Sequence, residues 1–369
     1  MVWERIDEIQ IYEYLGIRFA DSPHQQKRTI NHFSFHTFEN PKQMQMIKLS
    51  EIRKPVEEEM KEFDKRFKSA ISSNIPLLNI VTRYVLRRKG KQMRPLFVFL
   101  TSKLTGEITE STYTAASLIE LMHTATLVHD DVVDESNERR GVLSINAIWK
   151  SKVAVLFGDF LLARGLLLAV EKKDYQLLEI VSNASREMSE GELVQIQKSR
   201  SLNIDMDTYY EVIRKKTASL IAACTSCGAA ASGAGREEME TVYEMGINIG
   251  MAFQIKDDLF DYQPHGLIGK PTGNDIKEKK FTLPLIYALN QADSGKRKAL
   301  IRKIRNGNRS QKIVNEVVEF VNEMGGIVFA REKMDEFKQQ AIRSLNTFPE
   351  SPARTALKDL VEFTVSRNK

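Results

Sequence analysis

Two aspartate-rich clusters of the same design are the residues of this chain best suited to chemistry. The first reads DDVVD over Asp130–Asp134, and the second reads DDLFD over Asp257–Asp261. In each cluster the carboxylates fall at positions i, i+1 and i+4, so on a helix the first and last point the same way. Like charges at this spacing destabilise an isolated helix by a few tenths of a kcal/mol. A chain that carries the arrangement twice is therefore expected to bind cations there.

The type of ligand indicates which cation. Carboxylate oxygens without His or Cys in the repeated pattern favour Mg²⁺, which usually keeps several waters and binds through few carboxylates together with substrate phosphates. The two clusters therefore predict a cleft between two helices, closed by a magnesium-bound phosphate ester. The candidate metal ligands are Asp130, Asp131, Asp134, Asp257, Asp258 and Asp261.

Basic residues occur near both clusters. Arginine presents a planar fork that grips phosphate oxygens with two hydrogen bonds, and lysine supplies a compact charge. Taken alone, Lys91 and Arg94 also fit the solvated start of a helix that Pro95 could begin. Metal-binding acids beside so many cations predict a polyanionic substrate, most simply a diphosphate. The candidate phosphate-binding residues are Lys91, Arg94, Arg139, Arg140, Lys216, Lys270 and Lys280.

The elements that position these residues are predicted to be nearly all α-helical. Residues 96–263 contain no proline, and apolar residues recur there at helical spacing, as in Val242, Met245 and Ile249. The segment Tyr113–Val128 contains neither Gly nor Pro and is apolar around much of its circumference, which predicts a buried central helix. Strand-like alternation is scarce, so we expect an all-α fold.

One large domain is expected over residues 46–369, because no glycine-rich break is long enough to be a domain linker. Residues 1–45 show no sustained periodicity and are predicted to be a weakly ordered N-terminal extension. The two cysteines, Cys224 and Cys227, have redox or zinc-like C-x-x-C spacing but lack a second cysteine pair. We therefore predict that they are small packing residues in a helix.

Composition narrows the class of protein. With 42% hydrophobic and 28% charged residues, the chain resembles soluble globular proteins. The net charge of +5 is mild and mixed with acids, which argues against a nucleic-acid partner. No apolar run is expected to span a bilayer, and the first 30 residues lack the apolar stretch of a secretory signal. We therefore expect a cytoplasmic protein.

Six ordered motifs make the chain similar to the trans-polyprenyl diphosphate synthases, from about Ile47 to the C-terminus. The resemblance implies an all-α bundle of the isoprenoid synthase type, with a central cleft between two aspartate-rich helices. It departs where relatives often carry Glu-Gly-Lys, because this chain has Lys279 before Lys280, which leaves open which lysine contacts the diphosphate. The matching motifs are G-K-x-x-R-P at Gly90–Pro95, D-D-x-x-D with R-R-G at Asp130–Gly141, K-T at Lys216–Thr217, F-Q-x-x-D-D-x-x-D at Phe253–Asp261, G-K at Gly269–Lys270, and D-I at Asp275–Ile276 with K-x-T-L-P at Lys280–Pro284.

The resemblance also implies a role for each motif residue. Asp130, Asp131, Asp134, Asp257 and Asp258 would bind Mg²⁺ bridged to an allylic diphosphate, with Asp261 a weaker candidate. Arg139, Lys216 and Lys280 would hold the same diphosphate, helped by Lys270. Lys91, Arg94, His123 and Arg140 would hold isopentenyl diphosphate. The allylic diphosphate would ionise, the isopentenyl double bond would attack, and a proton would be lost, with Thr217 and Gln254 as dipoles near the cation.

The residues before the first cluster bear on product length. Ala125 and Thr126 lie about one helical turn before the first metal ligand, where farnesyl-making relatives place aromatic residues. Small residues there predict an open tunnel and a long-chain, octaprenyl-synthase-like product, plausibly for a quinone side chain. Met122, Ile119 or Phe157 would then form the floor. The simpler interpretation is that Ala125 and Thr126 only allow close helix packing.

Several alternatives stay open. A shorter-chain geranylgeranyl or farnesyl synthase would share all six motifs, and a non-catalytic partner subunit would share the fold. A class I terpene cyclase would need Ser or Thr where Asp261 stands, and Glu where His265 stands. His123 alone is also compatible with a core histidine, and we predict a structural role for His129. The resemblance further suggests a homodimer with at most peripheral membrane contact.

Overall fold

The computed structural model describes residues 48–87, 90–139, 141–201, 205–263, 273–306 and 310–366, without the side chains of residues 199–201. All of these belong to one compact unit, Ile47–Lys369. The predicted extension, residues 1–45, lies outside the described residues.

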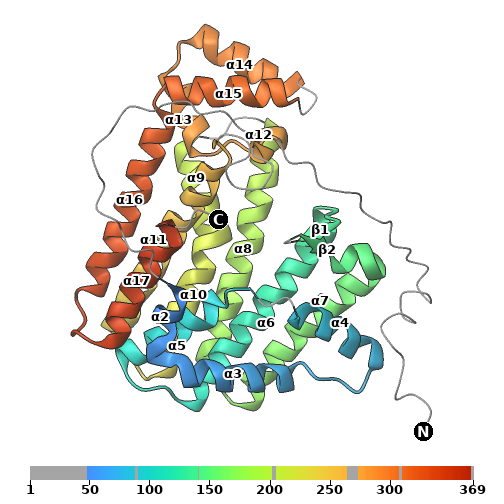
Figure 1. Ribbon diagram of the computed structural model, residues 1–369, viewed down its shortest axis with the longest axis vertical. Coiled ribbons are helices and arrows are strands. Elements are labelled where there is room, and N and C mark those ends of the chain that lie inside the picture. The colour runs from blue at the N-terminus through green and yellow to red at the C-terminus, as the bar shows by residue number, and fades with distance from the viewer. Residues whose placement is uncertain are drawn as a thin grey trace, which may run out of the picture. The chain divides into compact units, whose positions relative to one another are not determined.

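The described chain is almost entirely helical, which confirms the predicted all-α class (Figure 1). In these ranges the strands form a single two-residue antiparallel hairpin, which follows the first aspartate cluster. The elements are α2 (Leu49–Arg53), η1 (Lys54–Val56), α3 (Glu57–Ala70), α4 (Pro76–Leu86), α5 (Met93–Thr105), α6 (Glu110–Val133), β1 (Glu138–Arg139), β2 (Val142–Leu143), α7 (Ile145–Glu171), α8 (Tyr175–Ser201), α9 (Met206–Ile213), η2 (Arg214–Ala218), α10 (Ser219–Ala231), α11 (Arg236–Phe260), α12 (Asn274–Lys277), α13 (Leu283–Gln291), α14 (Ser294–Asn306), α15 (Gln311–Glu323), α16 (Gly326–Leu345) and α17 (Pro352–Ser366).

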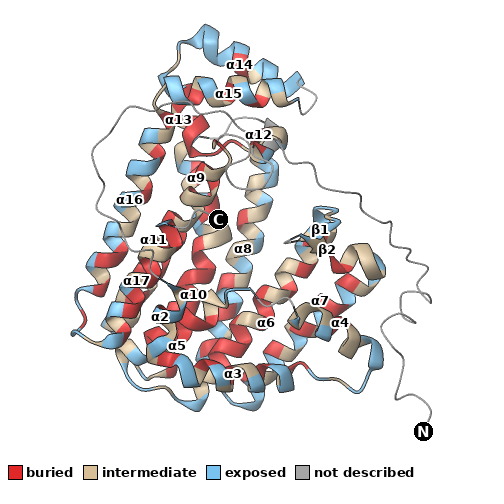
Figure 2. Ribbon diagram, viewed as in Figure 1, coloured by how far each residue is buried: buried red, intermediate tan, exposed pale blue. Residues whose placement is uncertain are grey.

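Helix α10 lies at the centre of the bundle and is buried along nearly its whole length (Figure 2). It packs against α5, α6, α8 and α11. Small residues allow this closeness: a Cβ added at Gly246 of α11 would lie 2.5 Å from the Cα of Ala222. Cys224 and Cys227 are fully buried free thiols in this helix, which confirms the predicted packing role. Burial raises the pKa of both thiols, so they stay protonated.

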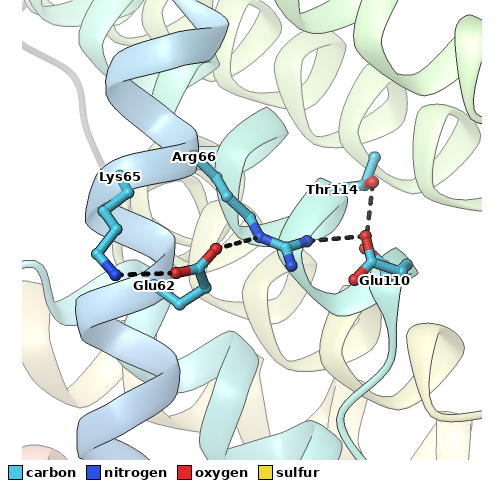
Figure 3. A network of polar contacts seen from close by, with 5 residues as sticks. All are labelled: Glu62, Lys65, Arg66, Glu110 and Thr114. Carbon is cyan, nitrogen blue, oxygen red and sulfur yellow. Dashed lines mark hydrogen bonds and ion pairs between the residues drawn. The ribbon is translucent and has the colours of Figure 1, made fainter.

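Helix α6 contains the segment predicted to be a buried central helix; it packs against α10, which holds the central position instead. A side-chain network fixes the N-terminus of α6 (Figure 3). Arg66 of α3 donates to Glu110 at 2.7 Å and to Glu62 at 3.0 Å. The same guanidinium lies 4.1 Å from the centre of the Tyr113 ring, a cation–π arrangement. This contact holds α3 against the start of the helix that ends in the first aspartate cluster.

Helix α7 corrects one expectation. By length and composition it is apolar enough to cross a membrane, with a mean hydropathy of 2.1 and only 33% of the relevant window buried. The core helix of a soluble protein passes the same test, so the finding is weak evidence for a span. Lys152, Asp159 and Arg164 interrupt its apolar sequence, and the helix packs closely against α6. Several large apolar residues of α7 nevertheless stay exposed, among them Leu156 and Leu166.

Candidate functional site

Both aspartate clusters lie at the C-terminal ends of long helices. Helix α6 ends at Val133 with Asp134 as its C-cap, and α11 ends at Phe260 with Asp261 as its C-cap. The C-terminal end of a helix carries a partial negative charge, which makes carboxylates unfavourable there by about 0.3–1 kcal/mol each. Neither helix has a basic residue in its last turn to compensate. Both ends therefore concentrate negative charge that other groups must balance.

At the first cluster, cations supply much of that balance. Asp131 is buried and accepts a hydrogen bond from Nε of Arg139 at 2.6 Å. Arg139 lies in β1, so the short hairpin returns the arginine to the helix end. Asp130 and Asp134 are exposed. Reduced hydration raises the pKa of Asp130, and Lys216 and Arg139 oppose that shift.

At the second cluster, neutral donors dominate. Asp258 is buried and accepts hydrogen bonds from the hydroxyl of Tyr209 at 2.7 Å and from Nε2 of Gln254 at 2.8 Å. Burial raises the pKa of Asp258 well above the usual carboxyl range, and the charge of Asp275 adds to the shift, although both hydrogen bonds oppose it. Asp257 is half-buried beside it. The hydrogen bonds that Asp258 accepts thus come from neutral groups.

Asp261 differs from the other cluster residues because it binds the backbone. One of its carboxylate oxygens accepts a hydrogen bond from the amide of Asp275 at 2.6 Å. This contact fastens the short helix α12 to the end of α11, so that Asp275 lies close to Asp258 and Asp261. The resemblance already made Asp261 the weaker metal candidate, and its structural bond gives a physical reason for that difference.

Thr217 and Gln254 are joined in a chain of hydrogen bonds that leads to the second cluster. The Thr217 hydroxyl donates to Oε1 of Gln254 at 2.7 Å, and Nε2 of Gln254 donates to Asp258. Thr217 lies in η2, a π-helical turn, and such turns are frequent at functional sites. The amide orientation of Gln254 is therefore set on both sides, with its oxygen toward Thr217 and its nitrogen toward Asp258.

Two lysines link the clusters electrostatically. Lys216 lowers the pKa of both Asp130 and Asp275, so its charge lies near both helix ends. Burial alone would lower the pKa of Lys280, but its ion pair with Glu278 at 2.7 Å, together with Asp275 and Asp134, raises it. A cavity of about 130 Å³ is lined by five of the sequence-predicted residues: Lys216, Thr217, Gln254, Asp258 and Lys280.

Lys279 and Lys280, which follow α12, have different surroundings. Lys280 lines the cavity, whereas Nζ of Lys279 donates to the backbone carbonyl of Arg305 at 2.9 Å. The geometry therefore favours Lys280 as the lysine that reaches a diphosphate. Lys270, the predicted helper, lies outside the described residues, as does Arg140.

The described residues that were predicted to hold isopentenyl diphosphate lie at the start of α5 and on α6. Arg94 of α5 lies close enough to Cys224 that its charge lowers the thiol pKa, which Glu120 raises. Glu120 and His123 are three residues apart and share a face of α6. The ammonium of Lys91 lies 5.2 Å from the centre of the Phe363 ring in α17.

Of the residues predicted to control product length, Ala125, Thr126, Met122 and Ile119 lie on α6 before the first cluster, and Phe157 lies on α7. Ala125 and Met122 are buried in the larger hydrophobic core together with Phe157 of α7. Thr126 is half-buried, and its hydroxyl donates to the carbonyl of His123 at 2.9 Å. His129 faces α7, where its ring lies 3.2 Å from the carbonyl of Val155, consistent with the structural role predicted for it.

A larger cavity, of about 830 Å³, lies on another face of α11 and is lined also by α15 and α16. Its walls include Lys256, Leu259 and Arg331 but none of the six cluster carboxylates. It also adjoins Gln263, after which the described range ends. Size alone therefore does not identify the reactive site, and the smaller cavity carries the convergent polar groups.

The carboxylates fit a divalent cation that shares its coordination with a ligand. The pKa values of Asp130, Asp258 and Asp261 are all raised, first by burial, so a cation placed among them would relieve unbalanced charge. Within the described ranges, no group of three or more His, Cys, Asp or Glu side chains converges into a complete metal site. That arrangement suits an ion that keeps waters and takes the rest of its ligands from phosphates.

Sequence reasoning missed four residues of this site. Tyr209 and Asp275 surround Asp258, while Glu192 and Gln195 of α8 contact Lys216. Asp275 stands inside a matched motif, and Tyr209 lies in a tyrosine pair seven residues before Lys216, which are signals that could have been used. Glu192 and Gln195 carry no local signal, because only the packing of α8 on η2 brings them to the lysine.

Comparison with known proteins agrees with this geometry. The polyprenyl synthetase family model matches residues 75–321. The chain is 34% identical over 300 residues to the octaprenyl diphosphate synthase of Escherichia coli K12, covering 81% of this chain and 93% of that protein. The structure resembles a decaprenyl diphosphate synthase from Rhodobacter capsulatus, with a TM-score of 0.82, 32% identity and coverage of 87% of this chain and 100% of that one.

A third similarity widens the range of relatives. A geranylgeranyl pyrophosphate synthase from Bacteroides thetaiotaomicron is 37% identical, with a TM-score of 0.74 and coverage of 86% of this chain and 99% of that one. Relatives with shorter-chain and longer-chain names are thus similarly close to this chain. The chain belongs to the polyprenyl synthetase family, all-α prenyltransferases that use a divalent metal ion with isopentenyl and allylic diphosphates.

Proposed function

We propose that this protein condenses isopentenyl diphosphate with an allylic diphosphate, farnesyl or similar, into a long-chain all-trans polyprenyl diphosphate for a quinone side chain. The observation that carries the proposal is a cavity lined by Asp258 of the second cluster, whose two lysines also act on carboxylates of the first cluster. Lys216 lies near Asp130, and Lys280, which follows α12, lies near Asp134. Both lysines also lie near Asp275. The octaprenyl and decaprenyl names of two relatives support the long-chain product.

Each side chain has a defined part in the reaction. We assign Asp130, Asp131, Asp134, Asp257 and Asp258 to Mg²⁺, which when bound neutralises the charge that develops on the departing diphosphate. Lys216, Arg139 and Lys280 bind oxygens of the same diphosphate, and Lys270 assists them. Lys91, Arg94, His123 and Arg140 bind isopentenyl diphosphate.

The bonds change in three steps. The allylic carbon–oxygen bond breaks and leaves an allylic cation with the diphosphate held by the cations of the cavity. The isopentenyl double bond then attacks, which forms a carbon–carbon bond, and a proton passes from the new cation to the released diphosphate. We assign to the oxygens of Thr217 and Gln254, which share a hydrogen bond, the stabilisation of positive charge before the proton leaves.

A product assay tests the proposal. Purified protein, Mg²⁺, labelled isopentenyl diphosphate and farnesyl diphosphate are incubated, and the products are separated by chain length. We expect a ladder that ends well beyond geranylgeranyl diphosphate. Products no longer than geranylgeranyl would retain the enzyme class and overturn the open tunnel, whereas no incorporation would favour the non-catalytic partner subunit. Replacing Mg²⁺ by EDTA should abolish incorporation.

We also propose a homodimer that covers an apolar face of α7 and α8. Large apolar side chains are exposed on these neighbouring helices, including Leu156 (57%), Leu166 (49%) and Leu193 (66%). Large exposed apolar surfaces mark interaction sites, and a second copy of the chain that covers these residues would account for the low burial of α7. Light scattering after size exclusion should give twice the 42.2 kDa chain mass, and Leu156→Glu with Leu193→Glu should reduce it.

Any membrane contact is proposed to be peripheral, through the outer face of α14. This helix contains six Lys or Arg residues and no acid. Lys298, Arg302 and Arg305 form one exposed stripe at helical spacing, whereas Leu300 and Ile304 are buried. Such clusters are attracted to anionic lipid surfaces by about 1 kcal/mol per residue. Flotation with anionic vesicles, compared with neutral ones, tests this contact.

We propose that residues 46–369 are the catalytic unit, that residues 1–45 are a weakly ordered extension, and that the protein is cytoplasmic. The family match over residues 75–321 lies inside the proposed unit and supports it. A chain that starts at Met46 should keep full incorporation activity, and cell fractionation measures the location.

A further inference from the structure

We propose that Glu192 and Gln195 of α8 are positioning residues for Lys216, and that Glu192 competes with the allylic diphosphate for its ammonium. The proposal rests on the proposed function, because it concerns how the same cavity exchanges a carboxylate for a substrate. It adds two residues that neither aspartate cluster contains.

The contacts of Lys216 are with α8. Its ammonium forms an ion pair with the carboxylate of Glu192 and donates a hydrogen bond to Oε1 of Gln195 at 3.1 Å. Glu192 and Gln195 are three residues apart, so they lie on one face of the helix. One charged and one neutral acceptor therefore hold the lysine where a diphosphate is expected.

Close packing of the α8 and η2 backbones fixes the position of Lys216 relative to Glu192 and Gln195. A Cβ added at Gly191 would lie 2.9 Å from the backbone nitrogen of Lys216 and 2.9 Å from the Cβ of Lys215. The backbone of α8 thus packs directly on η2, the π-helical turn that carries both lysines. Because the two backbones are in contact, the ammonium changes partners by rotation of its side chain.

The charges around Lys216 indicate that Glu192 is the partner that the diphosphate replaces. The charges of Glu192 and Lys216 both act on the pKa of Asp130, in opposite directions, so both groups face the first cluster. The side chains of Lys216 and Glu192 are 39% and 37% exposed, and ion pairs this close to water are weak. An ammonium has three donors, so it can keep neutral Gln195 while diphosphate oxygens replace the carboxylate.

The adjacent lysine provides a matched control. Lys215 forms ion pairs with Glu211 at 3.0 Å and with Glu190 at 3.5 Å. Glu190 therefore stands on the same helix, two residues from Glu192, and pairs with the neighbouring lysine of the same turn. Replacing either glutamate by glutamine removes one charge from α8 and preserves the side-chain shape.

Steady-state kinetics with saturating Mg²⁺ test the proposal. In Glu192→Gln we expect the KM for the allylic diphosphate to fall about threefold or more, because the competing carboxylate is gone. Gln195→Leu should raise that KM, and Glu190→Gln should leave it unchanged. In a Lys216→Gln background, Glu192→Gln should no longer lower the KM. A KM that rises or stays the same in Glu192→Gln alone would overturn the proposal.

A binding measurement separates this proposal from the reaction itself. Calorimetric titration with inorganic diphosphate and Mg²⁺ needs no turnover, so it applies even if the wild-type protein makes no product. Tighter binding by Glu192→Gln than by the wild type supports the exchange of partners, and weaker binding with a higher Mg²⁺ requirement would show that Glu192 serves the metal instead. Thermal unfolding of each variant confirms that it is folded, with Glu192→Ala as a second variant.

Discussion

At the end of α6 the negative charge is met by cations, whereas at the end of α11 it is met mainly by neutral hydrogen-bond donors. Asp131 binds Arg139, and Lys216 acts on Asp130. Asp258 instead binds Tyr209 and Gln254 in a buried setting. The first cluster is thus an open electrostatic site, whereas the second is built into the hydrophobic core. Substitutions should therefore separate activity from stability at the first cluster and combine them at the second.

The largest effect is expected for Asp130→Ala. Loss of this carboxylate should lower isopentenyl incorporation by about 10³-fold, yet change the free energy of unfolding by less than about 0.5 kcal/mol, because the side chain is exposed. Incorporation kinetics and thermal unfolding measure the two effects. The exposed Glu135 is the control, since Glu135→Ala should keep most activity. A strong loss of stability in Asp130→Ala would contradict the view that activity and stability are separable at the first cluster.

The next effect concerns product length. Ala125 stands five residues before the first cluster and Ala252 five residues before the second, and both are fully buried. Ala125→Phe should shorten the product ladder, because α6 is proposed to line the tunnel. Ala252 belongs to a separate core, so Ala252→Phe should strain that core without shortening the ladder. An unchanged ladder in Ala125→Phe would refute the open tunnel.

A smaller effect, on stability, is expected at the second cluster. Tyr209→Phe removes a buried donor to Asp258, which should lower the free energy of unfolding by about 1–2 kcal/mol. The control is Tyr210→Phe, because within the described residues the Tyr210 side chain makes ring contacts rather than a hydrogen bond. Chemical denaturation of both variants measures the difference. Equal losses would show that the Tyr209 bond contributes nothing specific.

The smallest effect is a gain in stability at the end of α6. Glu135 has a φ of 50°, and the amide of Ser136 donates to the carbonyl of Asp131 at 2.9 Å, the pattern of a Schellman motif that favours glycine. Glu135→Gly should stabilise the fold by about 0.5–1 kcal/mol. Glu135→Ala keeps the unfavourable conformation and should give no gain. Chemical denaturation measures both variants, and we expect a higher denaturant midpoint for Glu135→Gly than for Glu135→Ala. Equal midpoints would contradict the prediction.

Much of the site was predictable because it depends on local spacing. The i, i+4 aspartates, the helical segments and the buried cysteines follow from periodicity within one element. Lys216, Thr217, Gln254 and Lys280 were predicted from motifs, and they line one cavity with Asp258. The partners of these residues were not predictable, because Glu192 and Tyr209 reach them across 24 and 49 residues of sequence.

The sequence by itself determined which residues share a helix face, since that depends on a rise and rotation common to all α-helices. It also determined the family, through motifs in a set order. Only the tertiary structure decided that Asp258 is buried against Tyr209, that Asp261 binds the backbone of α12, and that Lys280 lines the cavity while Lys279 does not. The hydration, hydrogen-bond partners and neighbouring charges of a side chain depend on contacts between helices that are far apart in the sequence. Such contacts leave no pattern within a single segment of the chain.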